Sequence, residues 1–350
     1  MLGIDRRTLQ AAWTLFLFAL VLLVIYYIGR TLIIFAVALI FAHLLAPVVN
    51  FVERIVPARI PRVASLGLVY VALIALLVAA MIPIGSRISQ EAASLTTRLP
   101  DALKGDPLAN LPFPRWLEPF RAEVTDFLRN WFADFTQTIG PRIAAAGTTL
   151  IRGLGSVLGA VLIPILAFFF LKDGPELRDA IVKSFNADRR DFIDSLFSDI
   201  HLLLAQYIRA LVVLSLATFV FYSIFFAIIG APYPVLLAGI AAPLEFIPVV
   251  GPIIASATII VTAAVTGYGH FVLIIAFLLI YRLFQDYVLQ PYLMSAGVEL
   301  HPLMILFGVL AGEQLLGIPG MFFSVPAMAT LRLVIRRLQR RRMIPDTSGP

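Results

Sequence analysis

Apolar stretches of about 20 residues recur along the chain and are separated by shorter polar segments. About 20 consecutive apolar residues are needed for a helix to cross the roughly 30 Å hydrocarbon core of a bilayer. The pattern therefore predicts an all-α, polytopic integral membrane protein with about eight membrane segments. Continuous spans are expected at roughly 9–28, 31–51, 63–84, 149–171, 208–229 and 271–289.

Two further apolar stretches, 234–265 and 302–333, are too long for a single span and are interrupted in the middle. A continuous helix over either one would be about 48 Å long. The interrupting residues are Pro248, Gly251 and Pro252 in the first stretch, and Gly317 and Gly320 in the second. Proline removes a backbone donor, so we expect paired half-helices, the first pair meeting at 248–252. Unwound backbone at membrane depth is tolerated where it is buried in protein or lines a cavity, which makes both breaks candidate binding sites.

Two polar regions divide the apolar pattern. In 86–148, apolar residues at spacings of three and four predict an amphipathic helix outside the cytoplasm. We expect this helix either to lie on the membrane surface or on the protein itself, or to form a lid over an external vestibule. In 172–207 we expect a cytoplasmic amphipathic loop, with residues 172–175 ending one helix and starting the next. The expected regions are a three-span N-terminal region (1–85), the extracytoplasmic region (86–148), a fourth span (149–171), the cytoplasmic loop (172–207), a transport core (208–335) and a basic cytoplasmic tail (336–350).

Composition agrees with a membrane location. Hydrophobic residues make up 60% of the chain and charged residues 14%, whereas soluble domains carry about 25% charged residues. The net charge is +6, and much of the excess is arginine near the C-terminus. We interpret this excess as a topology signal and a contact with anionic lipid, not as a nucleic-acid site. Together with the arginines of the 53–62 loop, it predicts a multi-pass protein of the cell (inner) membrane with both termini in the cytoplasm.

Two topologies remain open for the interrupted stretches. Each could cross the membrane once, or each could fold back as a re-entrant hairpin. The loop 290–301 would be external in the first case and cytoplasmic in the second.

Few ionisable residues lie in the apolar segments, and each costs at least about 2.5–3.5 kcal/mol at the bilayer centre. Arg282 and Asp286 are four residues apart on one predicted helix and can pair locally. Glu245 and Glu313 each lie beside a break. Each is either a functional carboxylate or a buried, protonated acid with a structural role. The predicted substrate- or ion-binding residues are Glu245, Pro248, Gly251, Pro252, Arg282, Gln285, Asp286, Glu313, Gln314, Gly317 and Gly320.

The chain lacks the sequence motifs of several classes of enzyme and metal site. The chain has no cysteine, and its four histidines show no metal-binding spacing. It contains no G-x-x-x-x-G-K-[ST], H-E-x-x-H or G-x-S-x-G pattern. We therefore predict a protein that is not an enzyme and has no catalytic residues, no metal and no cofactor.

Several segments match the pattern of a known family. FFFLKDG at 168–174 resembles the family's F-F-L-K-D-G signature. QYIRALVVLS at 206–215, the stretch 230–254 and the stretch 290–331 resemble its C-terminal half in order and spacing. On these motifs the chain resembles the autoinducer-2 exporter family, with specific similarity over about 149–335. The residues that carry over are Pro248, Gly251, Pro252, Pro291, Gly297, His301, Pro302, Gly317, Gly320 and Pro326. Val249 and Val250 depart from the family's usual Tyr-Ile and leave that turn without a hydroxyl.

The resemblance implies export of a small polar signalling molecule of the kind used in quorum sensing, and a homo-oligomer, with a pentamer as the candidate. Some family members are described as Na⁺(Li⁺)/H⁺ antiporters. We therefore predict a secondary transporter that exports an autoinducer-2-like solute by alternating access around the two broken helices. The alternative is a Na⁺(Li⁺)/H⁺ antiporter that uses the intramembrane carboxylates. The expected partners are the lipid bilayer and either the solute or a monovalent cation and proton.

Overall fold

A computed structural model describes residues 27–53, 62–103, 157–293 and 300–343, with short stretches inside 13–23 and 118–130. Nearly all of the described residues are helical, and none of them forms a strand. The predicted all-α fold is therefore confirmed. Half of the first predicted span, 9–28, and most of the predicted extracytoplasmic region lie outside the described residues.

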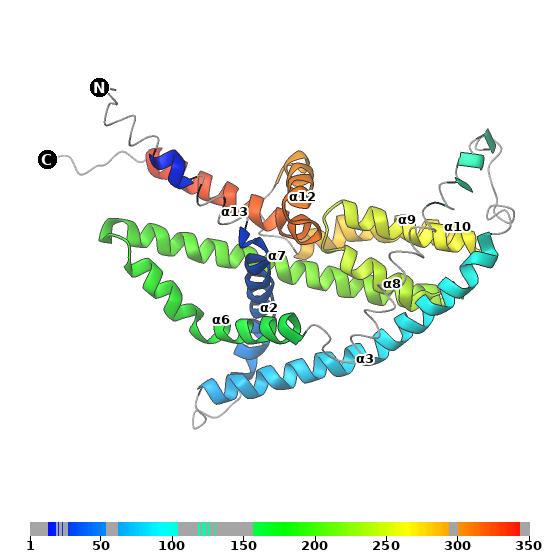
Figure 1. Cartoon of the computed structure of the whole chain (residues 1–350), viewed down its shortest axis with the longest axis horizontal. Helices are drawn as coiled ribbons and strands as arrows, with labels where there is room; N and C mark the ends of the chain where they lie inside the picture. The colour runs from blue at the N-terminus through cyan, green and yellow to red at the C-terminus, as the bar shows by residue number, and fades with distance from the viewer. Residues whose placement is uncertain are drawn as a thin grey trace.

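Two very long helices form the frame of the molecule. Helices α3 (Arg62–Leu103) and α7 (Ala187–Ile228) each have 42 residues, which corresponds to about 63 Å. In Figure 1 they run along the length of the molecule, with α2 (Gly29–Glu53) crossing between them and α6 (Val157–Lys183) next to α7. Both long helices are about twice as long as a bilayer core is thick. Their ends therefore extend past the apolar layer.

Two helix ends differ from the sequence prediction. Helix α6 continues through residues 172–175 to Lys183, so the predicted stop there is wrong. Pro175 is accommodated inside the helix, as prolines are in membrane helices whose freed carbonyls find other partners. Helix α3 continues past Ile84, the predicted end of the third span, to Leu103. The expected boundary between residues 85 and 86 therefore lies inside one helix.

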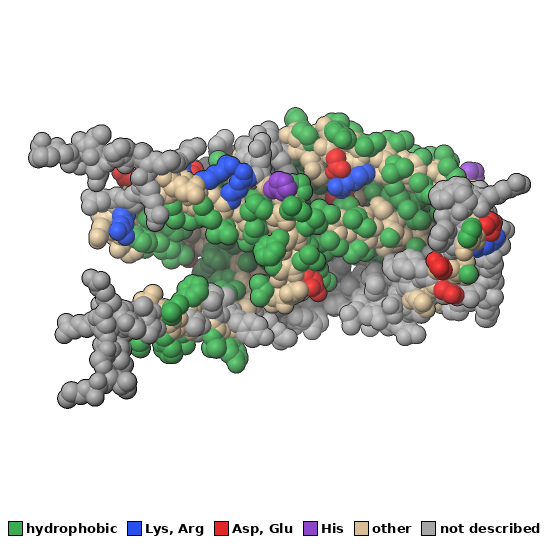
Figure 2. Space-filling model, turned by 90° about the horizontal axis from the view of Figure 1, so that it is seen from above, with side chains coloured by type: hydrophobic (Ala, Val, Ile, Leu, Met, Phe, Trp, Pro, Cys, Tyr) green, Lys and Arg blue, Asp and Glu red, His purple; other side chains and the backbone are tan. Residues whose placement is uncertain are grey.

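The outer surface is largely apolar. Five described helices are long and apolar enough to cross a membrane: Thr31–Val49, Leu66–Thr97, Arg189–Ile228, Phe271–Leu293 and Ile318–Gln339. Large side chains such as Leu68 and Ile228 are more than 70% exposed. The face in Figure 2 is mainly hydrophobic, and its charged side chains are gathered in a few places. A surface of this kind needs lipid or other protein as its solvent.

Both interrupted stretches are broken, as predicted, and each forms a hairpin. The first hairpin (234–265) consists of α8 (Pro234–Leu244) and α9 (Val250–Val265). The helices are joined by residues 245–249, so the break begins three residues before the predicted 248–252. Leu237 and Ala241 of α8 share one buried core with Ile259 of α9 and with α7 and α10 (Phe271–Phe284). Figure 1 shows α8 and α9 side by side.

The second hairpin joins α12 (Pro302–Leu316) to α13 (Ile318–Met343) at Gly317, which has φ +65°. The two helices touch backbone to backbone, because a Cβ on Gly320 would lie 1.9 Å from the Gly312 carbonyl oxygen. Helices α8, α9 and α12 have 11, 16 and 15 residues, fewer than the ~20 that span a bilayer. For the first stretch this geometry favours the re-entrant alternative, whereas α13, with 26 residues, is long enough to cross the bilayer.

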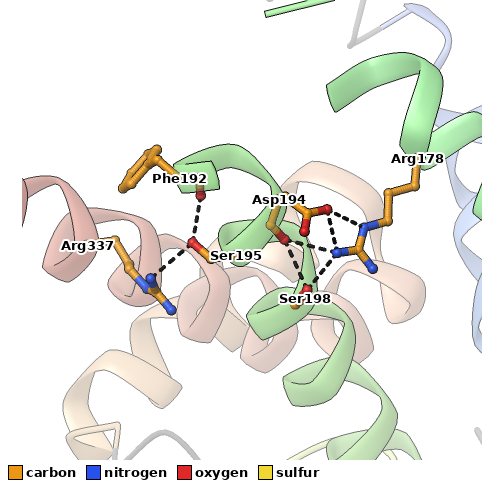
Figure 3. Close-up of polar contacts among 6 residues, drawn as sticks. All are labelled: Arg178, Phe192, Asp194, Ser195, Ser198 and Arg337. Atoms are coloured by element: carbon orange, nitrogen blue, oxygen red, sulfur yellow. Dashed lines mark hydrogen bonds and ion pairs between the residues drawn. The ribbon is translucent and has the colours of Figure 1, made fainter. Parts of the chain in front are cut away.

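Side-chain contacts tie the helices together at two places. Glu91 of α3 accepts a hydrogen bond from the Leu236 backbone N–H at 2.8 Å, capping the first turn of α8 from a distant part of the chain. Near the N-terminal end of α7, one arginine from α6 and one from α13 contact its side chains (Figure 3). Arg178 of α6 bonds Asp194 and Ser198 at 2.6 and 2.7 Å.

The second of these arginines, Arg337 of α13, donates to the Ser195 hydroxyl at 3.2 Å and forms an ion pair with Asp199. The sequence predicts a contact with anionic lipid for the arginines near the C-terminus. The structure uses at least this one to join α13 to α7.

We expect Gly320→Ala to open the second hairpin, because the added methyl group would collide with the Gly312 carbonyl. Overpacking of this kind costs about 1–3 kcal/mol or more, measurable as a lower unfolding midpoint of the detergent-purified protein. Gly67→Ala is the matched control, because a Cβ there meets nothing within 4 Å. It should leave the midpoint unchanged or raise it. Equal midpoints for the two variants would contradict the close contact.

Candidate functional site

Glu245 lies at the first break and is held by side chains from two other helices. It follows directly after α8 and is 9% exposed. The Thr218 hydroxyl of α7 donates to its Oε1 at 3.1 Å, and the Gln285 amide donates to its Oε2 at 2.7 Å. Each carboxylate oxygen thus has a partner from a neutral group. Buried carboxyl groups require such bonds because they have lost their water.

A second set of contacts fixes the two donors. The Thr218 hydroxyl also lies 2.9 Å from the Tyr281 hydroxyl of α10. Gln285 is 1% exposed and is the first residue of a π-helical turn, η3 (Gln285–Leu289), that interrupts the predicted 271–289 helix. Single π turns occur frequently at functional sites, and this one carries the residue that holds the acid.

The predicted Arg282–Asp286 pair is confirmed. The Arg282 Nε donates to Asp286 Oδ2 at 2.9 Å. Both side chains are more than a third exposed, so the pair contributes little to stability. Gln290 donates to the other Asp286 oxygen at 3.3 Å. Arg282 is therefore already neutralised beside the site by a carboxylate of its own helix.

The backbone at the first break is strained and closely packed. Val249 has φ 66° and ψ −56°, and the Val250 N–H bonds the Pro248 carbonyl at 2.7 Å, which is a γ-turn. A β-branched residue with positive φ is a rare outlier, and such outliers cluster at functional sites. Gly251 permits the turn, because a Cβ there would lie 1.7 Å from the Leu244 carbonyl oxygen.

Glu245 borders a cavity of about 270 Å³ between the first break, α7 and the second hairpin. Leu203, Leu211 and Leu214 of α7 form an apolar wall, and Ile305 and Pro326 close it from the second hairpin. Polar groups occur at five lining positions: Gln206, Tyr207, Glu245, Arg282 and Gln290. A mainly apolar cavity with a few placed polar groups has the usual character of a small-molecule site.

The structure brings together part of the predicted set. Glu245, Pro248, Pro252 and Arg282 line the cavity. Gln285, Asp286 and Gly251 support them through the contacts described above.

The remaining predicted residues belong to the second hairpin and lie away from this cavity. Glu313 and Gln314 are exposed on α12. Gly317 and Gly320 form the turn and the close helix contact. The second hairpin contributes to the cavity through a different part of its length, which includes Val325, Pro326 and Ala329 of α13.

Sequence reasoning missed the contribution of α7 to the site. Tyr207 falls in the predicted amphipathic loop 172–207, Thr218 in the predicted span 208–229 and Tyr281 in the predicted span 271–289, and none of them is among the predicted binding residues. The sequence signal for these three residues is a hydroxyl group inside an apolar helix. This signal is weak because such hydroxyls commonly bond a carbonyl of their own helix. Within the described ranges, no group of three or more His, Cys, Asp or Glu residues is arranged to hold a metal ion.

Comparison with known proteins finds matches to proteins named for transport. The profile of a family described as "AI-2E family transporter" matches residues 15–340. YueF of Bacillus subtilis (strain 168), named as a candidate transport protein, is 24% identical, and the match covers 97% of each chain. PerM of Escherichia coli (strain K12), named as a candidate permease, is 25% identical over 91% of this chain and 92% of its own. YrrI of Bacillus subtilis (strain 168), also named for transport, is 26% identical over 65% of this chain and 63% of its own length, just under two thirds of it.

We expect Thr218→Val to destabilise the protein, because it leaves Glu245 Oε1 and the Tyr281 hydroxyl without this partner. Loss of a buried partner costs about 1–3 kcal/mol, measurable as a lower unfolding midpoint in detergent. Thr262→Val is the control, because that buried hydroxyl bonds only a carbonyl of its own helix, at 2.8 Å. If both variants lost the same stability, Thr218 would not be the anchor of Glu245.

Proposed function

The chain belongs to the AI-2E family of transporters, and on that premise we propose that it exports a small polar solute through the cavity beside Glu245. The observation that carries the proposal is a buried carboxylate at a helix break, held by neutral donors and bordering a cavity between two hairpins. An ionisable group kept inside a membrane segment is expensive and marks a solute or ion path. The proposed cargo is a compact signalling molecule of the autoinducer-2 type.

The size of the cavity supports a small cargo. At about 270 Å³ it is smaller than the roughly 300–1,000 Å³ pockets that hold drug-sized ligands. Its leucine wall suits a short carbon skeleton, and its polar lining suits oxygen atoms on that skeleton. Arg282 is paired with Asp286 and therefore does not stand free to favour an anionic cargo. These features together favour a compact, uncharged, oxygen-rich molecule.

Alternating access requires a contact that closes one side of the cavity, and the Arg337–Asp199 ion pair is placed to do so. Asp199 lies one helical turn beyond Leu203 on α7, about 6 Å along the axis. Arg337 lies eight residues beyond Ala329 on α13, about 12 Å along its axis. The pair thus joins the two cavity walls just beyond the cavity, on the side where α13 ends. We propose that it breaks when the cavity opens to that side.

We expect Glu245→Gln to lower solute flux in proteoliposomes by about tenfold or more, equivalent to about 1.4 kcal/mol, while the protein stays folded. The amide keeps the shape of the side chain and removes its charge. Glu313→Gln is the matched control, because Glu313 does not line the cavity, and it should keep the flux of the parent protein.

The assay should follow labelled polar solutes and internal pH together, with and without a sodium gradient. Wild-type flux in Glu245→Gln would remove this acid from the mechanism. A sodium-driven pH change without solute movement would contradict solute export itself.

We expect Arg337→Gln to expose the cavity from the side where α13 ends. The natural chain has no cysteine, so a single Val325→Cys reports on the cavity through its reaction with a membrane-impermeant maleimide. Labelling from that side should become severalfold faster, and the exchange Asp199→Arg with Arg337→Asp should restore the slow rate.

Arg336→Gln is the control for this experiment, because Arg336 is the exposed neighbour on the same helix. Equal labelling rates in Arg337→Gln and Arg336→Gln would show that the ion pair does not close the cavity.

A further inference from the structure

Tyr207 lines the cavity from α7, and its hydroxyl group has no hydrogen-bond partner among the described residues. Three buried side-chain polar atoms lack a hydrogen bond within the part of the chain that the structure describes: Tyr207 Oη, Ser223 Oγ and Arg332 Nη1. Of these three residues, Tyr207 alone is part of the cavity lining. A buried hydroxyl without a partner loses its bonds to water and gains nothing in return. A phenylalanine would fill the same space without that cost, so the hydroxyl needs another explanation.

Tyr207 and Glu245 are two polar groups of the lining that come from different parts of the fold. On α7, Tyr207 lies 11 residues before Thr218, the residue that holds Glu245. Leu211 and Leu214 line the cavity between them. The cavity therefore offers hydrogen-bonding groups at separate places in its lining, with apolar side chains between them along α7. A cargo that bonds both groups carries more than one oxygen atom on its carbon chain.

We propose that the Tyr207 hydroxyl is a cargo-binding group, which bonds a terminal hydroxyl or carbonyl oxygen of a short, uncharged polyol-like solute. The proposal rests on the proposed function, because it assumes that the cavity carries the solute. It goes further by assigning a specificity-determining residue outside both hairpins. The hydroxyl is satisfied when the cavity is filled and unsatisfied when it is empty. The binding of a matching cargo therefore gains a hydrogen bond without first breaking one inside the protein.

The test compares two probes that differ by one terminal hydroxyl, erythritol and 1,2,3-butanetriol, in proteoliposomes of the full chain. The natural protein should prefer erythritol by about fivefold, the effect of one net hydrogen bond. Tyr207→Phe should move both probes at the same rate. Its unfolding midpoint in detergent should equal or exceed that of the natural protein, because the substitution removes an unsatisfied buried group.

Two hydroxyl deletions serve as controls. Ser223→Ala removes another unpartnered hydroxyl of α7 that does not line the cavity, and it should keep the preference. Tyr281→Phe removes a hydroxyl that is bonded to Thr218, and it should lower the unfolding midpoint.

The proposal is overturned if Tyr207→Phe keeps the preference for erythritol, or if it lowers the midpoint as Tyr281→Phe does. It is also overturned if the natural protein moves other polar solutes but shows no preference between these two probes. Failure of the proposed function looks different. In that case the natural protein moves no polar solute of any kind, and Glu245→Gln matches it.

Discussion

A carboxyl group inside an apolar interior must be hydrogen-bonded by the protein, because no water replaces a missing partner. Glu245 is such a group, at the point where α8 ends. Thr218 of α7 and Gln285 of the π-helical turn after α10 donate the hydrogen bonds that it needs. Their bonds fix the first hairpin against its neighbours and leave one side of the acid at the cavity. These contacts join α7, α8 and the helix formed by α10 and its π-helical turn around one side chain.

Backbone contacts meet the same constraint at the hairpins. An interrupted helix exposes carbonyl and N–H groups that lipid cannot satisfy. Here the freed groups turn inward, through the γ-turn at Val249 and the close approach at Gly251. In the second hairpin, Gly312 and Gly320 let two backbones touch in the manner of small residues at membrane helix contacts. Both hairpins are therefore tightly built, although each interrupts a helix.

The sequence predicts those parts of the fold that depend on local chemistry. Hydropathy predicts the helices, Pro and Gly predict both breaks, and a spacing of four predicts the Arg282–Asp286 pair. The sequence predicts less where residues far apart in the chain determine the contacts. Glu245 and Gln285 are 40 positions apart, and nothing in their spacing indicates that they meet. The helix through residues 172–175 is a second example. There the packing of the helix outweighs a Gly-Pro pair that normally ends a helix.

Helix α7 carries both the Asp199 ion pair and, 19 residues later, the Thr218 bond to Glu245. It is a single unbroken rod between these points, about 28 Å in length. In the proposed transport cycle, such a rod would act as a lever with its pivot at Thr218. A tilt of about 10° would move the Asp199 end by roughly 5 Å, enough to separate an ion pair while hardly shifting the acid. Leverage of this kind would convert a sub-ångström adjustment around the proposed cargo into the opening of a passage at the far end.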